Sequence, residues 1–518
     1  MTADVEHCFI TVTDRAFFPG TLATVNSVLH FQPGADVWVV NRESESITEP
    51  QAELLKQNSR VRLIPSSKLA QKDRHLYPWE LKAYAAHDLC EGYDVLVGID
   101  SDCLLCSSVD DQLEHCLRSA GFLGGQDGSG VDYGPAYSIY GIPTPSRNRR
   151  YMSTSLFFCA VNQENRRLLR RWTESCNSAE FNGRGSYPGH GDQGVLNAVL
   201  YAENKSANVE LLANAIWSQH WAYWDSIIEF RDHVFVNRSW GGERQRAFHC
   251  GGAEKFWEKS HRDRVIGENS LQTWPYVWFL AMFFFGSCHN WSMDPLQYLP
   301  PGSHHLVDDL VQFLPQIFQI YPASRSLWEE LGDPMIDRLL AGVPRLMSLG
   351  GGNLSELFDL LGKYRHARRF VEIGGYEGGS ILALALRFAN RDIDFFTVES
   401  FMGNMDGKMD GNRLPSRARC IEALARFPTL RAKLVPGDSR LAASLFEDAS
   451  LDFVFIDGCH ETSAVLQDIS RWLPKLAKGG VLAGDDYNWD SVRFGIHEKL
   501  QGTVSVTPSG CVWWKTFD

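Results

Sequence analysis

The chain has 518 residues, more than one ordinary domain holds, so we expect two or three domains. Hydrophobic residues make up 44% of the sequence, which is enough for sizeable cores and too many for a disordered chain. The formal net charge of −13 argues against a nucleic-acid partner, because binding to a phosphate backbone needs a basic surface.

Cysteine usage and the apolar runs predict a cytoplasmic protein without a membrane span. The 12 cysteines are scattered, and no two close pairs have the spacing of a zinc site, so we expect reduced core thiols. The first residues lack a basic stretch followed by an apolar one, so no signal peptide is expected. The most apolar run, 276–286, is too short to cross a bilayer, and we expect a buried or interfacial helix there.

The first third of the chain alternates apolar strands with helices, which is typical of a parallel sheet with crossover helices. We expect strands at 7–13, 36–40, 60–64 and 94–100 and helices at 19–31, 48–58 and 78–90. Ligands of such sheets bind beyond the carboxyl ends of the strands. Asp100 and Asp102 lie at such an end, after the continuous apolar strand that finishes at residue 100.

A second alternation begins near residue 350, and a stretch rich in aromatic residues and proline separates the two. We expect helices at 353–364, 378–389 and 462–477, strands at 368–374, 393–400, 431–438, 451–458 and 479–486, and a terminal hairpin over 502–517. The predicted domains are therefore residues 1–264 and 350–518, both α/β, joined by a helical connector at 265–349.

Asp100 and Asp102 have the D-x-D spacing that lets two carboxylates hold one divalent cation. Mg²⁺ and Mn²⁺ prefer such oxygen ligands, completed by phosphate oxygens. Taken alone the motif is weak, because a solvated turn also accounts for it. The later segment "FHCGGAEKFW" (248–257) adds an imidazole, a glycine and a lysine in the pattern H-x-x-G-x-x-K-x-W.

Together these motifs resemble the retaining glycosyltransferases of the glycogenin and galactosyltransferase type, which have the GT-A fold. The resemblance covers roughly residues 5–260, although Phe256 stands where that family usually has proline. It implies a nucleotide-sugar donor, of the UDP-linked class, and a glycan or glycoconjugate acceptor. It also implies that Asp100, Asp102 and His249 ligate Mn²⁺ or Mg²⁺ and that Gly252 and Lys255 contact the donor diphosphate.

Four more residues are carried over from the same resemblance. "HGDQGVLNAVL" (190–200) places Asp192 and Gln193 near the reacting sugar or the acceptor, although Asp192 could simply cap the following helix. Asp14, after the first strand, is expected near the nucleotide base. Lys82 is expected at the diphosphate, with an ordinary surface charge as the alternative.

"FVEIGGYEGGS" (370–380) is a strand, an acid and a glycine-rich turn that opens a helix. Alone it could bind a dinucleotide or nothing, but the usual nicotinamide fingerprint G-x-G-x-x-G is absent. With the acids that end the next two strands, it resembles class I S-adenosylmethionine-dependent methyltransferases. The resemblance implies that the methyl donor is bound by Glu372, Gly374, Gly378, Glu399 and Asp438.

The fourth and fifth strands of this part end in further acids, in the segments "FIDGCH" and "AGDDY". This arrangement is similar to metal-dependent sugar O-methyltransferases such as macrocin O-methyltransferase. The similarity implies that Asp457, Asp485 and Asp486 bind Mg²⁺ and that His460 is the general base. A strand-end cap for Asp457 and a backbone-bonded helix start for His460 are the alternatives.

The sequence thus predicts a bifunctional enzyme, with retaining sugar transfer in the first domain and O-methylation of a sugar hydroxyl in the second. Surface polysaccharide, glycolipid or glycosylated-metabolite synthesis in a bacterium would be the setting, by analogy. One alternative is that a single domain is catalytic and the other binds or positions a glycan. Another is that the methyltransferase acts on an unrelated metabolite.

Overall fold

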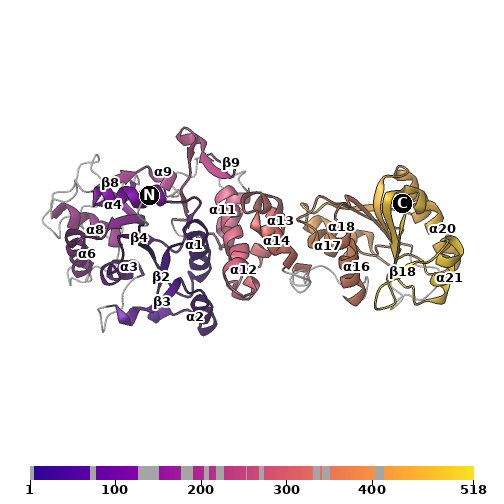
Figure 1. Cartoon of the computed structure of the whole chain (residues 1–518), viewed down its shortest axis with the longest axis horizontal. Coiled ribbons are helices and arrows are strands. Elements are labelled where there is room, and N and C mark those ends of the chain that lie inside the picture. Colours follow the sequence, from indigo (N-terminus) through magenta and orange to yellow (C-terminus); the bar gives the residue numbers. More distant parts are fainter. Residues whose placement is uncertain are drawn as a thin grey trace. The chain divides into compact units, whose positions relative to one another are not determined.

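The protein, described by a computed structural model, divides into two compact units, Met1–Leu306 and Val307–Asp518 (Figure 1). The structure describes residues 5–69, 78–126, 151–176, 191–202, 209–217, 227–251, 254–267, 273–330, 339–340, 351–402 and 414–517. Gly252, a predicted diphosphate contact, lies outside these ranges. Each unit contains a seven-stranded sheet with a parallel core and flanking helices, which confirms the predicted α/β fold class.

The main sheet of the first unit follows the predicted strands. Its strands are β1 (His7–Thr13), β2 (Asp36–Asn41), β3 (Val61–Pro65), β4 (Val95–Ile99), β6 (Phe122–Gln126), β7 (Met152–Ala160) and β8 (Val209–Leu212). They lie in the order β3-β2-β1-β4-β7-β6-β8. The first four are parallel, and β7 runs antiparallel between β4 and β6. All five residues of β4 are buried, as expected for a strand covered on both faces.

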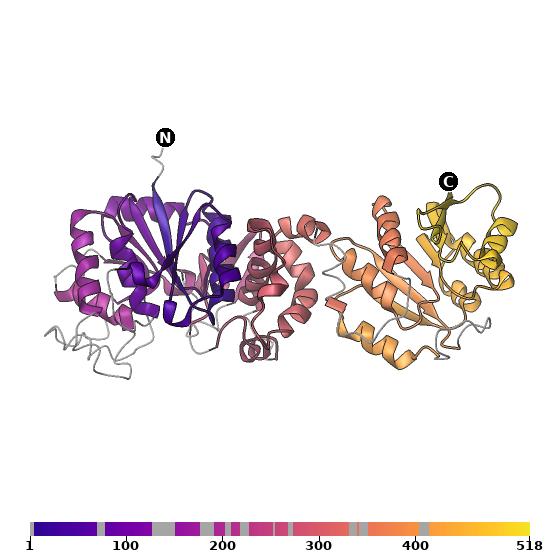
Figure 2. The same cartoon turned by 90° about the horizontal axis from the view of Figure 1, so that it is seen from below.

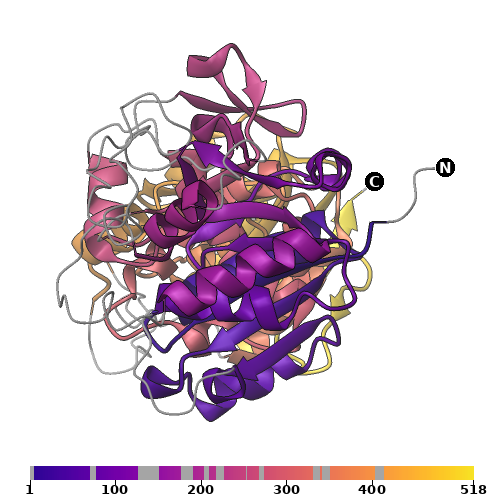
Figure 3. The same ribbon diagram turned by 90° about the vertical axis from the view of Figure 1, so that its left-hand side faces the viewer.

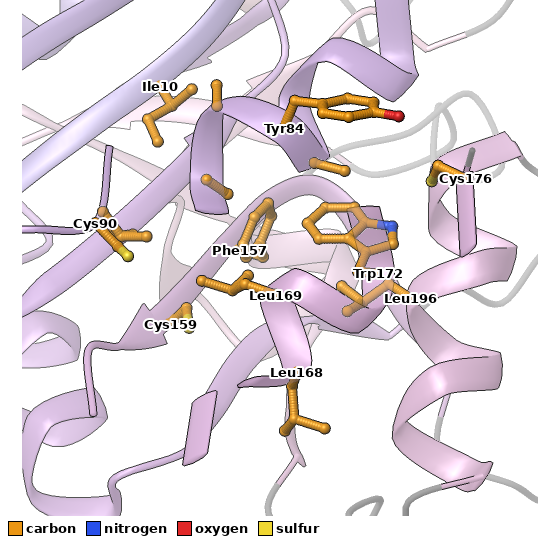
Figure 4. Close-up of a cluster of buried hydrophobic side chains, with 14 of the residues drawn as sticks. Ile10, Tyr84, Cys90, Phe157, Cys159, Leu168, Leu169, Trp172, Cys176 and Leu196 are labelled. Atoms are coloured by element: carbon orange, nitrogen blue, oxygen red, sulfur yellow. The ribbon is translucent and has the colours of Figure 1, made fainter. Parts of the chain in front are cut away.

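Helices cover this sheet. They are α1 (Phe18–Phe31), α2 (Glu49–Lys56), α3 (Pro78–Asp88), α4 (Asp110–Ser119), α6 (Gln163–Cys176), α8 (Gly191–Ala202) and α9 (Asn214–Trp217), with the 3-10 turns η1 (Glu43–Glu45) and η2 (Ser66–Lys68). α3, α6 and α8 pack together on one side, which faces the viewer in Figure 3. The core beneath them holds the edge-to-face pair Phe157 and Trp172 with Ile10 and Leu169 (Figure 4). Burial of these apolar side chains holds the helices to the sheet.

Two small antiparallel sheets complete the first unit. One consists of β9 (Ile228–Arg231), β10 (Val234–Asn237) and β11 (Glu243–Arg244), with the 3-10 turn η5 (Arg238–Trp240) between β10 and β11. The other pairs β5 (Cys103–Leu105) with β12 (Ala247–His249). Because β5 begins directly after the D-x-D turn, this pairing brings residues about 150 positions apart to one place.

The apolar run at 276–286 is a buried helix, as predicted. It forms the end of α11 (Thr273–Leu280) and a π-helical turn η6 (Ala281–Gly286), and every residue of the run is buried. The Asn26 side chain in α1 donates to the Met282 carbonyl at 2.8 Å, and Trp278 Nε1 donates to the Leu105 carbonyl at 2.8 Å. α10 (Lys259–Gly267), α12 (Ser287–Asn290) and η7 (Pro295–Tyr298) lie beside it in sequence. Among the described residues, no helix is both long and apolar enough to cross a membrane.

The second unit has a sheet of five parallel strands extended by a hairpin. Its strands are β13 (Arg369–Ile373), β14 (Asp394–Glu399), β15 (Ala432–Pro436), β16 (Leu451–Ile456), β17 (Leu476–Gly484), β18 (Ser505–Val506) and β19 (Trp513–Phe517). They lie in the order β15-β14-β13-β16-β17-β19-β18. β19 is antiparallel to both β17 and β18, which confirms the predicted terminal hairpin.

Helices lie on both faces of this sheet, orange on one side and yellow on the other in Figure 2. The helices of the second unit are α13 (His305–Ile320), α14 (Ala323–Glu330), α16 (Gly351–Lys363), α17 (Gly379–Arg387), α18 (Arg417–Arg426), α19 (Ser439–Ala442), α20 (Thr462–Trp472) and α21 (Asp490–Lys499), with the 3-10 turns η9 (Ala443–Leu445) and η10 (Leu473–Lys475). α20 and α21 pack over a core that includes Val454, Ile469 and Trp472.

The segment predicted as a connector, 265–349, contributes helices to both units. Its first half packs on α1 and β5, as the hydrogen bonds from Asn26 to Met282 and from Trp278 to Leu105 show. Its second half belongs to the second unit, where Trp328 Nε1 in α14 donates to the Leu386 carbonyl in α17 at 2.7 Å. The boundary between the units falls within α13.

Candidate active sites

The first candidate site is built where β4 ends and turns into β5. The Asp100 amide donates to the Ser155 carbonyl at 2.8 Å, and the Cys103 amide returns to the Asp100 carbonyl at 3.0 Å. In the β5–β12 register His249 pairs with Cys103. Its Nε2 therefore lies 3.3 Å from Asp102 Oδ1 and 3.8 Å from Asp100 Oδ2. The structure thus brings together the three residues predicted as metal ligands.

Two lysines face the same pair of acids. Lys255 Nζ lies 2.6 Å from Asp102 Oδ2, and Lys82 Nζ lies 2.5 Å from Asp100 Oδ1. Burial alone would raise the pKa of Asp102, but the charges of Lys255 and His249 outweigh it and hold this pKa well below its usual range. Lys82 is buried, so the alternative that it is an ordinary surface charge is excluded.

The donor set at this site fits a divalent cation. In each carboxylate one oxygen meets a lysine while the other faces His249, and ligand atoms of Asp100, Asp102 and His249 all lie within 4.8 Å of one another. The lysines therefore orient the two carboxylates so that Asp100 Oδ2 and Asp102 Oδ1 both point toward His249. Two carboxylates and one imidazole form a mixed oxygen and nitrogen set that suits Mn²⁺.

Asp192 and Gln193 approach this site from the start of α8. Asp192 Oδ2 lies 3.6 Å from Lys82 Nζ, and Gln193 Oε1 accepts from the Thr154 amide at 3.0 Å. Burial raises the pKa of Asp192 to about 6, partly opposed by Lys82 and reinforced by Asp100. Burial would lower the pKa of Lys82, but Asp100 and Asp192 together raise it. Lys82 thus links Asp100, a predicted metal ligand, to Asp192, which is predicted near the reacting sugar. No local sequence pattern indicated this link.

Asp14 follows β1, and Gly20 lies in α1, the helix that comes next along the chain. The Asp14 carboxylate accepts from the amides of Ala16 and Phe17 at 2.9 and 3.0 Å and lies 3.8 Å from Arg42, so the protein already engages it. Its predicted contact with a nucleotide base stays a prediction. Gly20 was not predicted from the sequence. A Cβ added there would lie 2.4 Å from the carbonyl oxygen of Ser101, inside the D-x-D turn, so a side chain at position 20 would collide with this turn.

The second candidate site lies at the carboxyl ends of β13, β14, β16 and β17. Glu372 is fully buried, with Ser380 Oγ donating to one carboxyl oxygen and Thr397 Oγ1 donating to the other at 2.9 Å. Burial raises the pKa of Glu372 to about 7, although both hydroxyls oppose the shift. Its carboxyl group therefore ties β13 to α17 and β14.

Glu399, at the end of β14, fixes the loops around the predicted methyl-donor site. Its carboxylate accepts from the Tyr376 amide at 2.9 Å and from the Phe401 amide at 2.8 Å. Tyr376 and Phe401 both have positive φ, 50° and 62°, an uncommon conformation for residues with side chains. Asp438 instead caps α19, accepting from the Arg440 amide at 2.9 Å. The predicted donor contacts of these acids stay predictions.

Gly374 and Gly378 form the turn between β13 and α17. Gly374 has φ 91°, and a Cβ there would lie 2.0 Å from the Asp457 carbonyl oxygen. Gly378 has φ 88° and directly precedes α17. The glycine-rich turn therefore lets β13 approach the end of β16, where Asp457 stands.

A second group of potential metal ligands comprises Asp457, His460 and Asp486, whose ligand atoms lie within 4.8 Å of one another. His460 Nε2 lies 2.9 Å from Asp486 Oδ2. Asp485, predicted as a ligand, accepts from Asn353 Nδ2 through both carboxylate oxygens at 3.1 Å. Asn353, at the start of α16, was not foreseen from the sequence.

This acidic group is more crowded than the first. Burial raises the pKa of Asp457 well above its usual range, and the charges of Asp485, Glu372 and Asp486 add to the effect. Asp486 also has φ 56°, so its backbone is held in the left-handed region. Two carboxylates and an imidazole beside further acids fit a divalent cation, which would offset this repulsion.

Comparison with known proteins identifies part of the second unit. Residues 371–487 match a family model described as a methyltransferase domain. These residues lie within the second unit. The match falls on the part of the chain in which the sequence predicts a methyltransferase. The curated relative "Uncharacterized protein y4gI" of Sinorhizobium fredii is 26% identical over 145 residues, which are 27% of this chain and only 16% of that protein.

Solved structures similar to parts of the chain include glycosyltransferases and O-methyltransferases. The galactosyltransferase LgtC, in complex with donor and acceptor sugar analogues, is 14% identical with a TM-score of 0.38, and the match covers 56% of this chain and 98% of LgtC. An O-methyltransferase from Bacillus cereus in complex with SAH is 17% identical with a TM-score of 0.27, covering 36% of this chain and 92% of that protein.

Proposed function

We propose that the protein is a bifunctional transferase acting on a glycan or glycoconjugate. The first unit would transfer a sugar from a nucleotide-sugar donor with retention, and the second would methylate a sugar hydroxyl with S-adenosylmethionine. The observation that carries the proposal is the pairing of a methyltransferase domain with a second, separate acid–imidazole cluster at the carboxyl end of another sheet. Joining the two activities in one chain raises the local concentration of the first product near the second site.

In the first unit, Asp100, Asp102 and His249 would hold Mn²⁺ or Mg²⁺. The cation supplies charge stabilisation for the departing nucleoside diphosphate. Lys255, now 2.6 Å from Asp102, is placed to turn its ammonium group toward the donor phosphates. Its neighbour Gly252 would let the donor approach the backbone.

The reacting sugar of the donor would lie beside Asp192 and Gln193. The Thr154 amide donates to the side-chain carbonyl oxygen of Gln193, which would fix the Gln193 side chain beside Asp192. Asp192, with a pKa of about 6, would be largely ionised at neutral pH and would stabilise positive charge that develops at the anomeric carbon. Lys82 would keep both Asp192 and Asp100 in place.

In the second unit, the turn with Gly374 and Gly378 would cradle the methyl donor, with Glu399 at its ribose and Asp438 near its adenine. Glu372 would support the turn from beneath through Ser380. The known preference of acids for ribose hydroxyls at this strand end favours the assignment of Glu399.

At the acceptor hydroxyl, His460 would take the proton while Asp486 orients its ring from 2.9 Å. Asp457 and Asp486, with Asp485 positioned by Asn353, would hold Mg²⁺, which lowers the pKa of a sugar hydroxyl. The acidic character of this cluster favours a substrate with vicinal hydroxyl groups over an unrelated metabolite.

The test separates the two activities in one protein. Wild-type enzyme is incubated with a panel of nucleotide sugars and acceptors, with and without S-adenosylmethionine, and the products are weighed by mass spectrometry. Asp102→Ala should abolish sugar transfer and keep methylation of pre-made product, and Asp457→Asn should do the reverse. If one variant of a folded protein removes both activities, the two-site proposal fails.

Ligand binding distinguishes the alternative that one unit has lost its chemistry. UDP with Mn²⁺ and, separately, S-adenosylhomocysteine should each raise a melting temperature of the wild-type protein. A response to only one of them would favour a catalytic unit joined to a glycan-binding or positioning unit. None of the twelve cysteines, all within the described residues, is in a disulfide, which is consistent with the proposal that the enzyme works in the cytoplasm.

A further inference from the structure

The second unit contains a cavity of about 390 Å³ that lies away from the candidate methyl site. Its walls come from α13, α14, the end of α17 and the residues that lead into β14 and β15. The candidate site occupies the carboxyl ends of the parallel strands, whereas Ile393 and Arg431 precede β14 and β15. The cavity therefore opens at the amino-terminal edge of the sheet, and its volume lies within the range of about 300–1,000 Å³ typical of ligand pockets.

A proline inside α13 helps to form the cavity wall. Pro315 has no N–H, so the Val311 carbonyl, four residues earlier, cannot accept its usual helical hydrogen bond. Thr429 Oγ1 donates to that carbonyl at 2.9 Å instead. Val311, Pro315 and Thr429 all line the cavity. Because Thr429 provides the hydrogen bond that the Val311 carbonyl would otherwise lack, this part of the cavity wall is a well-ordered feature and not a packing defect.

The inner surface of the cavity is apolar, and its rim carries three arginines, Arg325, Arg391 and Arg431, and one acid, Asp392, which pairs with Arg431. Leu314, Phe318 and Phe388 are each less than 10% exposed. The guanidinium of Arg325 lies 5.4 Å from the ring centroid of Phe318, and that of Arg391 lies 5.1 Å from the centroid of Phe388. Each guanidinium is therefore placed over one of the two rings that form the apolar wall.

Backbone carbonyls hold both guanidinium groups in place. Arg325 donates to the Asn390 carbonyl at 2.8 Å, and Arg391 donates to the Tyr364 carbonyl at 2.8 Å. These bonds fix the geometry without cancelling the positive charges. Burial and the nearby charge of Arg368 lower the pKa of Arg391, and the charge of Glu329 partly opposes this shift.

Asn390 supplies a polar feature of the lining. Its Nδ2 donates to the Arg325 carbonyl and to Glu329, but its buried Oδ1 has no hydrogen-bond partner within the described part of the chain. A buried acceptor without a donor is destabilising, because it has lost its hydrogen bonds to water. A ligand carrying a hydroxyl or amino group would remove that cost.

We propose that this cavity binds a small amphipathic anion, a ligand class that neither transfer reaction requires. Its apolar body would pack against Leu314, Phe318 and Phe388, and its acid group would lie between Arg325 and Arg391. The binding does not depend on the proposed transferase activities, because no residue of either candidate active site lines the cavity.

The test uses 8-anilinonaphthalene-1-sulfonate, which combines aromatic rings, a sulfonate and one N–H donor and fluoresces when its rings leave water. The full-length protein is saturated with S-adenosylhomocysteine and with UDP and Mn²⁺, so that both candidate active sites are blocked. We expect one saturable equivalent of probe. Octanoate should displace it, acetate should not, and neutral 1-octanol should compete at least fivefold less well than octanoate.

Variants locate the bound probe. Ala389→Trp, which fills the cavity from its partly exposed rim, should abolish the saturable signal, whereas Ala389→Ser should keep it. Arg325→Gln should weaken binding about fivefold through the lost charge, and Arg493→Gln, an exposed arginine on α21, should leave it unchanged. Circular dichroism melting checks that each variant is folded.

Either of two results would overturn the proposal. Unchanged probe binding in a folded Ala389→Trp protein would place the probe elsewhere. Equal competition by octanoate and 1-octanol, together with no effect of Arg325→Gln, would show an apolar cavity without anion selectivity. Should Ala389→Trp fail to fold, the Arg325→Gln and Arg493→Gln pair decides the matter.

Discussion

Replacing Gly374 with alanine should destabilise the second unit and displace Asp457. At φ 91° an alanine is strained, which costs about 1–2 kcal/mol. In addition, the new Cβ would lie 2.0 Å from the carbonyl oxygen of Asp457 and 2.5 Å from its carbonyl carbon. Both are backbone atoms, so no side chain can rotate away and the end of β16 itself must shift.

A second glycine separates these two effects. Gly479, in β17, has φ 79°, but a Cβ there would meet nothing within 4 Å. Gly479→Ala should therefore cost only the conformational term, about 1 kcal/mol, which lowers the melting temperature of a unit this size by about 2–4 °C. Gly374→Ala carries the overpacking cost as well, for a total of about 3 kcal/mol or more and a fall of at least about 6 °C.

Scanning calorimetry is the assay, with the relevant transition identified in the wild-type protein as the one that S-adenosylhomocysteine raises. Isothermal titration then measures the affinity for that ligand. Gly374→Ala should weaken it, because the turn that carries the glycine borders the proposed donor site, and Gly479→Ala should leave it unchanged. Equal stability losses in the two variants would refute the idea that close approach to Asp457 is what requires glycine at position 374.

Three further predictions address charge and metal. Burial raises the pKa of Glu372 to about 7, so between pH 4.5 and 7 the native state binds a proton that the unfolded state has lost. The free energy of unfolding should therefore fall as the pH rises from about 4.5 to 7, by roughly 3 kcal/mol at most. Glu372→Gln should flatten this pH dependence in calorimetry, and an unchanged slope would contradict the prediction. His249→Ala should weaken Mn²⁺-dependent UDP binding at least tenfold in titration with little loss of stability, whereas a fallen melting temperature with normal affinity would mark a packing role. Methylation should stop in EDTA and return with Mg²⁺, and full activity in the chelator would exclude a metal at the methyl site. Asn353→Ala should release Asp485 and so raise the Mg²⁺ concentration that methylation needs by about tenfold or more.

Much of the fold could be predicted because strand and helix signals are local. The apolar run before Asp100 corresponds to β4, and its acids lie at the strand end as expected. The strand ends before Glu399 and Asp457 were also located correctly, since continuous apolar runs bounded by acids and glycines mark buried parallel strands. The aromatic run at 276–286 was correctly read as a buried helix, because its length is insufficient for a span.

The contacts that set the electrostatics of each site could not be predicted in the same way. The distance between Lys82 and Asp192 depends on how α3 and α8 pack together, and 110 residues separate them in sequence. Asn353 reaches Asp485 from a helix more than 130 residues earlier. In neither case does a nearby spacing or composition signal exist, because such pairings arise only when separate helices meet the same sheet edge.

The two acid clusters differ in how their negative charge is balanced, and this difference bears on metal dependence. At Asp102 the facing groups are Lys255 and His249, whose charges lower its pKa against the effect of burial. At Asp457 the facing groups are further acids, Asp485 and Glu372 first among them, and they raise its pKa in the same direction as burial. A bound cation would therefore relieve more repulsion in the second unit, whereas in the first it would compete with lysines that already hold the carboxylates. The ionised form of the cluster around Asp457 should therefore depend more on a divalent ion. In the cluster around Asp102, the lysines set the geometry of the carboxylates before any ion binds.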